Sequence, residues 1–311
     1  MRPHPILTMA IFYIIVQVGA IILAPLFIPQ ADLLPNPNDP INPLIYIVMI
    51  LLMTAIMLIL IRSGRQKILQ IIFYIAIIFT LFYIFTPILL EIEIQFSTEY
   101  GGWPSIVGSA IIAFILLLAL MKNGEWYVIN AVGLILAIGV TAILGVIFGI
   151  LPVIILLIIM AIYDAIAVYK TKHMVALAEG VAPMRLPMMF VVPSRRDFSM
   201  NDLKDKRLSS QDKRERDAFF MGLGDVIIPG ILTVSASVHL TMVDSFILTS
   251  NLWVAIGVII GGLIGYVILL NYVMKGNPQA GLPFLNSGAI FGYIIAYLIV
   301  YQNLSLGAIG L

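Results

Sequence analysis

Residues 156–170 read LLIIMAIYDAIAVYK, and residues 218–232 read AFFMGLGDVIIPGIL. Each stretch places one aspartate, Asp164 or Asp225, inside an apolar run that is typical of a membrane-spanning helix. A carboxylate in hydrocarbon costs roughly 2.5–3.5 kcal/mol on insertion scales, so an acid at such a position usually marks a functional site. The two stretches therefore indicate a membrane-embedded helical fold whose function depends on a pair of carboxyl groups.

The composition agrees with a polytopic membrane protein. Of the 311 residues, 61% are hydrophobic and 11% are charged, and the mean hydropathy is +1.09. A typical soluble domain has about 45–50% apolar and about 25% charged residues. The chain has no cysteine, which excludes disulfides, thiolate nucleophiles and thiolate metal ligands. The first apolar run, 6–28, is longer than the roughly 7–15 residues of a signal-peptide core, so we interpret it as a membrane span.

Apolar runs of about 20 residues predict an all-α fold with nine transmembrane helices. The predicted spans lie near residues 6–28, 43–61, 68–90, 104–121, 127–149, 152–169, 218–239, 246–274 and 284–302. In this arrangement all 17 Lys and Arg residues fall on one side of the membrane, and the loops on the other side carry acids but no bases. The positive-inside rule then predicts a cytoplasmic N-terminus and an extracytoplasmic C-terminus.

The sequence predicts three parts along the chain. Residues 1–169 contain the first six spans, 170–217 form a hydrophilic cytoplasmic loop, and 218–311 contain the last three spans. Each of the two helical parts contributes one of the aspartates. Within the loop, residues 194–217 mix charges of both signs densely and contain few apolar side chains, which is typical of a solvated linker.

A short apolar run inside the hydrophilic loop differs from the rest of that loop. Residues 188–192 are flanked by prolines and predict a β-strand. Two interpretations remain open. The strand either rests on the bilayer surface or offers its edge, with Met189 and Val191, to an extended peptide substrate.

The positions of the two aspartates predict that they face each other. Asp164 lies six residues before Lys170, and Asp225 lies eight residues after Asp217. At 1.5 Å per helical residue, both then lie about 9–12 Å inside the cytoplasmic boundary. The two spans run antiparallel, and consecutive elements are usually neighbours in space. We therefore expect the two carboxyl groups to meet at the same depth.

Such a pair suits peptide hydrolysis. Two carboxyl groups a few ångströms apart in a low-dielectric site do not both ionise easily, so they share one proton, as in aspartic proteases. The ionised partner takes a proton from a water molecule that attacks the amide, and the protonated partner donates a hydrogen bond to the carbonyl. This chemistry needs no metal, no cofactor and no covalent intermediate.

Residues next to the aspartates support the same prediction. Gly222 and Gly224 flank Asp225 in Gly-Leu-Gly-Asp, and their lack of side chains lets another backbone approach. Tyr163 precedes Asp164 and either lines the same cavity or is a packing aromatic.

The segment 276–286, GNPQAGLPFLN, precedes the last predicted span. Pro283 has no backbone N–H and restricts Leu282 to extended conformations. Irregular backbone near membrane depth is tolerated where it lines a watery cavity or is buried in protein. The alternative is an ordinary helix start with proline near the first position. Beside two intramembrane aspartates, we favour a role in the site.

Three motifs in order resemble the presenilin and signal peptide peptidase family of intramembrane aspartyl proteases. Residues 163–164 match the YD motif of the family in span six, and residues 222–225 match its GxGD motif in span seven. Residues 280–283 lie where the family carries Pro-Ala-Leu-Pro. Ala280 and Gly281 depart from that pattern, whereas the Leu-Pro pair keeps it. The resemblance covers the whole nine-span layout.

The resemblance implies that Asp164 and Asp225 are the catalytic pair. It also implies that residues 281–283, which are Gly281, Leu282 and Pro283, help to shape the site and to bind substrate. The implied substrates are transmembrane peptides or single-span membrane proteins within the lipid bilayer, with no nucleic acid partner. The short cytoplasmic loop is closest to a prokaryotic presenilin homologue, so we expect a multi-pass protein of an archaeal or other prokaryotic cell membrane.

Alternative functions fit the sequence less well. A proton- or cation-conducting channel or transporter also places aspartates within the membrane. A zinc protease would need an HExxH motif and a serine protease a GxSxG motif, and the sequence has neither. Prepilin peptidases share the GxGD motif, but nothing in this chain resembles their cysteine-rich segment. Gly257, Gly261 and Gly265 form a close-packing face that favours contacts within the bundle over dimerisation. The oligomeric state stays open.

Overall fold

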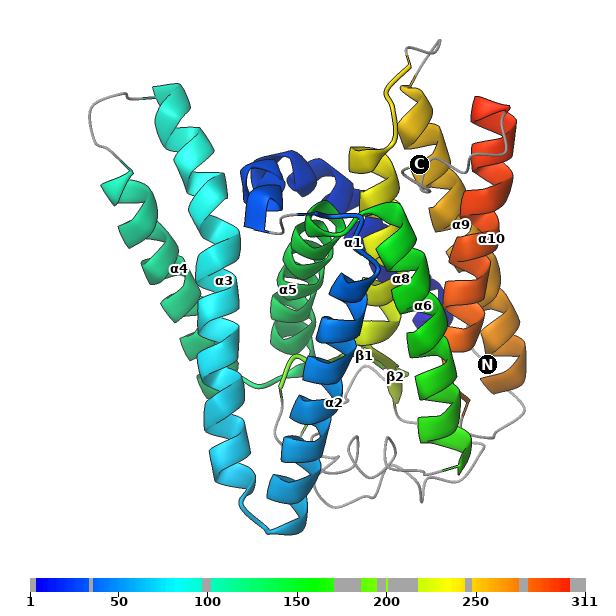
Figure 1. Ribbon diagram of the computed structural model, residues 1–311. Helices are drawn as coiled ribbons and strands as arrows, with labels where there is room; N and C mark the ends of the chain where they lie inside the picture. The colour runs from blue at the N-terminus through cyan, green and yellow to red at the C-terminus, as the bar shows by residue number, and fades with distance from the viewer. Residues whose placement is uncertain are drawn as a thin grey trace. The chain divides into compact units, whose positions relative to one another are not determined.

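The computed structural model describes residues 4–33, 36–96, 102–170, 186–194, 200, 218–243, 248–273 and 279–302. These residues form nine α-helices, two short helices of other types and one two-stranded sheet (Figure 1). The α-helices are α1 (His4–Leu23), α2 (Ile41–Arg62), α3 (Gln66–Phe96), α4 (Trp103–Lys122), α5 (Trp126–Ile147), α6 (Ile150–Ala165), α8 (Leu223–His239), α9 (Ser250–Val273) and α10 (Leu282–Tyr301). The other elements are the 3-10 helix η1 (Ala24–Leu33), the π-helix η2 (Ile166–Lys170), β1 (Met189–Pro193) and β2 (Ala218–Gly222).

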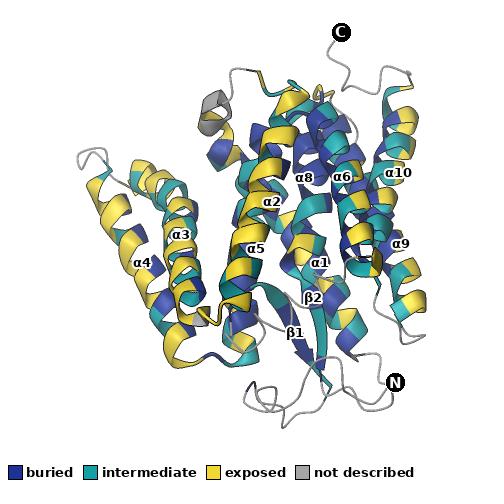
Figure 2. Ribbon diagram, turned by 60° about the horizontal axis from the view of Figure 1, so that its bottom comes forward, coloured by how far each residue is buried: buried dark blue, intermediate teal, exposed yellow. Residues whose placement is uncertain are grey.

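The helices confirm the predicted all-α membrane fold. Eight of those in the described ranges are long and apolar enough to cross a bilayer, and α8, with 17 residues, is a shorter apolar helix. Figure 2 shows that large parts of α3 and α4 are exposed, although these helices are apolar. Exposed apolar helix faces are what a lipid environment requires. The chain is therefore an integral multi-pass membrane protein, and its orientation stays a prediction.

The seventh predicted span, 218–239, is wrong at its start. Residues Ala218–Gly222 form β2 instead of helix, and α8 begins at Leu223. Two aromatic residues favour the extended form here, and Gly222 and Gly224 weaken a helix at this point. Because extended residues rise about 3.3 Å each rather than 1.5 Å, the depth derived for Asp225 from a continuous helix does not hold.

The third predicted span ends too early. Helix α3 continues to Phe96, so Glu91 and Glu93 lie on its last turns rather than in a loop. Glu93 accepts hydrogen bonds from the backbone N–H groups of Gly102 and Ser105, each at 3.1 Å, and from the Ser105 hydroxyl. The glutamate thereby satisfies N–H groups at the start of α4 that have no partner inside that helix. This capping contact gives the acidic end of α3 a structural role.

The chain forms two compact units. The first comprises Met1–Met9, Ala55–Val140 and Leu177–Leu223, and the second comprises Ala10–Thr54, Thr141–Ala176 and Gly224–Leu311. The first unit holds the α3–α4 pair and the β1–β2 sheet, and the second holds both intramembrane aspartates. Most of the predicted loop 170–217 lies outside the described residues, so the proposed linker within it stays a prediction.

The core of the second unit lies where α6, α8, α9 and α10 pack together. Its fully buried side chains include Leu157, Leu232, Val258 and Tyr293. Helices α9 and α10 run side by side (Figure 1) and meet through glycines. A methyl group added at Gly261 would clash with the backbone oxygen of Gly288 on α10. The glycine face predicted on α9 therefore packs within the bundle, and this close contact holds the start of α10 in place.

Candidate active site

Asp164 lies in the last turn of α6 and is buried, with 4% of its surface exposed. Its Oδ2 accepts a hydrogen bond of 3.1 Å from the backbone N–H of Leu282, the first residue of α10. The N-terminus of a helix presents unpaired N–H groups and a partial positive charge, so it binds a carboxylate favourably. The start of α10 therefore fixes the orientation of this carboxyl group.

Asp225 lies in the first turn of α8 and is half-buried. Its carboxyl group lies against the backbone of Gly281: a methyl group built there would lie 3.0 Å from Oδ2 and 3.1 Å from Cγ of Asp225. That spacing is tighter than an ordinary van der Waals contact. The absence of a side chain at Gly281 therefore makes room for the Asp225 carboxyl group.

Both carboxyl groups thus contact one dipeptide, Gly281–Leu282. Asp164 reaches it from the end of α6, and Asp225 reaches it from the start of α8. All three segments belong to the second unit. The convergence that the three sequence motifs indicated is therefore present within one compact part of the molecule.

Pro283 explains why the chain turns into a helix at this point. It is the second residue of α10, where a backbone N–H would have no partner inside the helix. The structure thus shows the ordinary helix start, which was one of the two alternatives, and the role of this segment in substrate binding stays a prediction. The proline-directed helix start points the N–H of Leu282 at Asp164.

Tyr169 is a residue that sequence reasoning missed. It lies on η2, and its hydroxyl donates to Oε1 of Gln279 at 2.6 Å and accepts from the N–H of Ala280 at 3.3 Å. Its hydroxyl therefore holds the segment directly before Gly281. The only signal in the sequence is its place five residues after Asp164, which by itself predicts no contact.

The other predicted support residues have different surroundings. Tyr163 is partly buried and packs against the apolar core that includes Leu282, which agrees with a packing aromatic. A methyl group at Gly224 would come no closer than 4.0 Å to the side chain of Ile228, so the space on that face is open. Gly222 is the last residue of β2, opposite Met189. Whether any of them supports catalysis stays a prediction.

The predicted strand forms, one residue further along, and pairs within the chain. β1 runs antiparallel to β2, with Val191 opposite Phe220. The buried side chain of Asn130 bonds both backbone groups of Val191, accepting from its N–H at 2.8 Å and donating to its carbonyl at 2.7 Å. The outer edge of β1 is therefore closed at Val191 by a side chain of α5.

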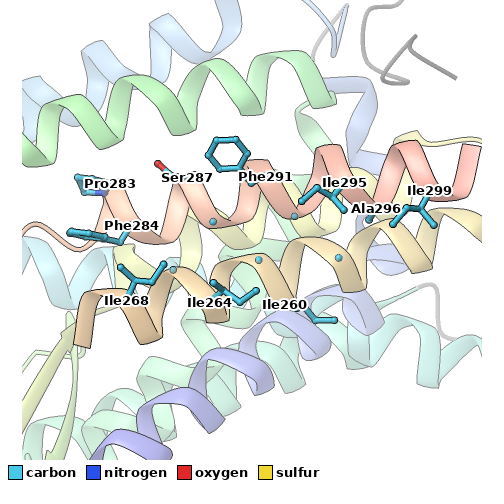
Figure 3. A pocket seen from close by; sticks show the side chains of 15 residues that line it. Ile260, Ile264, Ile268, Pro283, Phe284, Ser287, Phe291, Ile295, Ala296 and Ile299 are labelled. Carbon is cyan, nitrogen blue, oxygen red and sulfur yellow. The ribbon is translucent and has the colours of Figure 1, made fainter. Parts of the chain in front are cut away.

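An apolar groove of about 760 Å³ lies along α9 and α10 (Figure 3). Ile260 and Ile264 line it from α9, and Phe291 and Ile295 line it from α10. One end lies at Pro283, but neither aspartate lines the groove. It is thus separate from the contact between the carboxyl groups and Gly281–Leu282.

Comparison with known proteins identifies the family. The sequence profile described as "Signal-peptide peptidase, presenilin aspartyl protease" matches residues 9–301. The chain belongs to this family. Two solved structures of a presenilin family intramembrane aspartate protease, in space groups C222 and P2, are 33% and 34% identical to it, each with a TM-score of 0.66. The matches cover 95% of this chain in both cases, and 99% and 98% of those chains. A comparison with curated proteins gave no match.

Membership in the presenilin family sets the class of substrate. Family members are aspartyl proteases that work within the membrane, so their substrates are transmembrane segments in the bilayer. The matched range 9–301 includes both aspartates, Tyr169 and the Gly281–Leu282 dipeptide.

Proposed function

We propose that this protein is an intramembrane aspartyl endopeptidase in which Asp164 and Asp225 together activate a water molecule. The observation that carries the proposal is the contact of both carboxyl groups with the Gly281–Leu282 dipeptide. Two acids from different helices rarely share one backbone segment in a membrane without a functional reason, because burying each of them is costly. The family supports the same chemistry.

The reaction needs one proton on the pair. The ionised carboxyl group removes a proton from water, and the water oxygen bonds to the carbonyl carbon of the substrate amide. The protonated carboxyl group donates a hydrogen bond to the carbonyl oxygen as it gains negative charge. The tetrahedral intermediate then collapses, the amide nitrogen takes a proton, and the C–N bond breaks to give a carboxylic acid and an amine.

The substrate has to unwind locally, because helical hydrogen bonds shield its carbonyl groups from attack. Within the β1–β2 sheet, the backbone of Val191 is bonded to Asn130. In an antiparallel pair, the backbone groups of two residues directly opposite each other point either both toward the partner strand or both away from it. Since the backbone groups of Val191 point away from β2, those of Phe220, which lies opposite, point toward the outer edge of β2. We therefore assign the substrate-pairing edge to β2, which continues directly into α8. In this arrangement β1, with Met189 and Val191, pairs with the inner edge of β2, and the substrate pairs with the outer edge of β2.

Cleavage of a transmembrane peptide by the purified protein tests the proposal. Asp164→Asn and Asp225→Asn each remove the carboxylate with little change in volume, and each should lower cleavage at least a thousandfold, near the detection limit. Asp39→Asn is the matched control: Asp39 accepts a hydrogen bond from the N–H of Ile41, the first residue of α2, and asparagine caps as well as aspartate. It should cleave at the wild-type rate.

Two results would contradict the proposal. One is wild-type cleavage by either intramembrane variant. The other is ion flux in proteoliposomes that requires both aspartates while no peptide is cleaved, which would favour a channel or transporter instead.

A further inference from the structure

Gln17 is a polar residue in the middle of an apolar helix. It lies on α1 and is completely buried, with 0% of its surface exposed. Its Nε2 donates a hydrogen bond of 3.1 Å to the backbone carbonyl of Val226 on α8, the residue that follows Asp225. A buried amide within a membrane span requires a partner, and here the partner belongs to the turn that carries an aspartate of the site.

A small residue on α8 makes this contact possible. A methyl group built at Gly230 would lie 2.9 Å from Nε2 and 3.1 Å from Oε1 of Gln17, and 2.7 Å from Cγ2 of Thr141 on α5. Any side chain at Gly230 would therefore push the amide of Gln17 away. The amide oxygen of Gln17 has no hydrogen-bond partner among the described residues. The hydrogen bond from Nε2 to the Val226 carbonyl therefore sets the orientation of the Gln17 side chain.

The first turn of α8 needs such a support. Pro229 lies within the helix and has no N–H, so it cannot donate the intrahelical hydrogen bond that would end at the Asp225 carbonyl. A proline at this position weakens the backbone hydrogen bonding of the turn around it. The hydrogen bond from Gln17, which lies on α1, ends at the carbonyl of Val226 in this turn, one residue after Asp225.

We propose that Gln17 is a positioning residue for Asp225. By holding the Val226 carbonyl, it fixes the first turn of α8 and thereby the place of the Asp225 carboxyl group against Gly281. This role rests on the proposed function of the aspartate pair. Gln17 does not touch the substrate, so it acts on the rate of the chemical step rather than on substrate binding.

The test replaces Gln17 with methionine, which has a similar size but donates no hydrogen bond. Gln17→Met should lower kcat at least tenfold and leave KM within twofold, because a small misplacement of a catalytic group slows the chemical step. The amide hydrogens of residues 223–230 should also exchange faster in deuterated water. Gly230→Ala should give the same pattern.

Gln70→Met is the matched control. The amide of Gln70 donates to the hydroxyl of Tyr74 on its own helix, α3, at 2.8 Å. The substitution removes the same chemical group from a helix that carries neither aspartate. It should leave kcat, KM and the exchange of residues 223–230 at wild-type values.

Three results would overturn the role of Gln17. The first is a wild-type kcat in Gln17→Met. The second is a parallel loss of kcat, substrate affinity and thermal stability, which indicates a general folding defect. The third is an equal loss of kcat in Gln70→Met.

If the wild-type protein cleaves nothing, the proposed function fails and this role with it. If the wild type cleaves, Asp225→Asn does not, and Gln17→Met is unaffected, only the positioning role fails.

Discussion

Gly281 is the residue on which the geometry of the site depends. It lies against the Asp225 carboxyl group, and the next N–H, of Leu282, donates to Asp164. Its φ of −80° is accessible to any residue, so only the available space restricts the side chain at this position. The family pattern, Pro-Ala-Leu-Pro, has an alanine here. We therefore expect that a single methyl group fits at this position once the neighbouring atoms move by a few tenths of an ångström.

A graded series at Gly281 tests this at the residue scale. Gly281→Ala should lower cleavage by less than about tenfold, because Asp225 has to move by only a few tenths of an ångström. Gly281→Val should abolish it, because a branched side chain cannot fit beside the carboxyl group. Initial rates of cleavage of one transmembrane peptide by both variants provide the measurement. Equal rates for the wild type and Gly281→Val would show that Asp225 does not act from this position.

Tyr169 gives a second prediction at this scale. Tyr169→Phe removes the hydroxyl that bonds Gln279 and the N–H of Ala280. Each such bond contributes about 1 kcal/mol, so the segment before Gly281 should lose order and cleavage should fall several-fold. Tyr127→Phe is a suitable control, since the hydroxyl of Tyr127 accepts a hydrogen bond from the side chain of Asn123 within the first unit. An unchanged rate in Tyr169→Phe would exclude a contribution from this contact.

At the scale of elements, the β1–β2 sheet is stabilised by hydrogen bonds from α5, because its two strands are too short to be stable alone. Two strands of five residues are marginal alone. Asn130 of α5 bonds both backbone groups of Val191, and the N–H of Leu223 donates to the Met188 carbonyl at 3.0 Å. The side chain of Asn130 thereby fixes β1 in its position and closes one edge.

Asn130→Leu should therefore change where the substrate is cut. Without the amide, β1 loses its anchor, and β2 can pair with a substrate strand in more than one register. We expect mass spectrometry of the products to show additional cleavage sites displaced by one or two residues, with total cleavage reduced several-fold. An unchanged product pattern would argue against a template role for the sheet.

At the scale of the whole molecule, the distribution of charge predicts the topology. In the predicted nine-span arrangement, all 17 Lys and Arg residues fall on one side of the membrane, which the positive-inside rule predicts to be the cytoplasmic side. The structure supplies the helices but not the direction in which they cross a bilayer. The absence of cysteine makes the prediction simple to test, because any thiol introduced is the only one in the chain.

Single cysteines on either side should label from opposite faces. Ser210→Cys lies in the loop predicted to be cytoplasmic, and Ser97→Cys lies between the third and fourth spans on the other side. In intact cells a membrane-impermeant thiol reagent should label only the cysteine at position 97. The cysteine at position 210 should react only after the cells are opened. The reverse pattern would show that the protein is inverted.

The sequence by itself determined the membrane fold, and it singled out Asp164 and Asp225 as the two predicted catalytic acids. Helix boundaries agree to within a few residues for most spans, because a hydrophobic run and its end are contiguous in the chain. The three motifs at residues 163–164, 222–225 and 280–283 could be recognised in the sequence because each of them is contiguous in the chain. What the pattern missed is local as well: α3 runs on to Phe96, where an apolar run ends before the helix does.

Only the tertiary structure decided which distant residues meet. β2 replaces the start of a predicted helix because it pairs with β1, and no local periodicity reports a partner across a long loop. Gln17 and Val226 are 209 positions apart, and Asp164 and Leu282 are 118 apart. Such contacts depend on how whole helices pack, and a hydrogen bond between them leaves no regular spacing in the sequence. The physical reason is that periodicity records the environment of one element, whereas an active site depends on the relative placement of several.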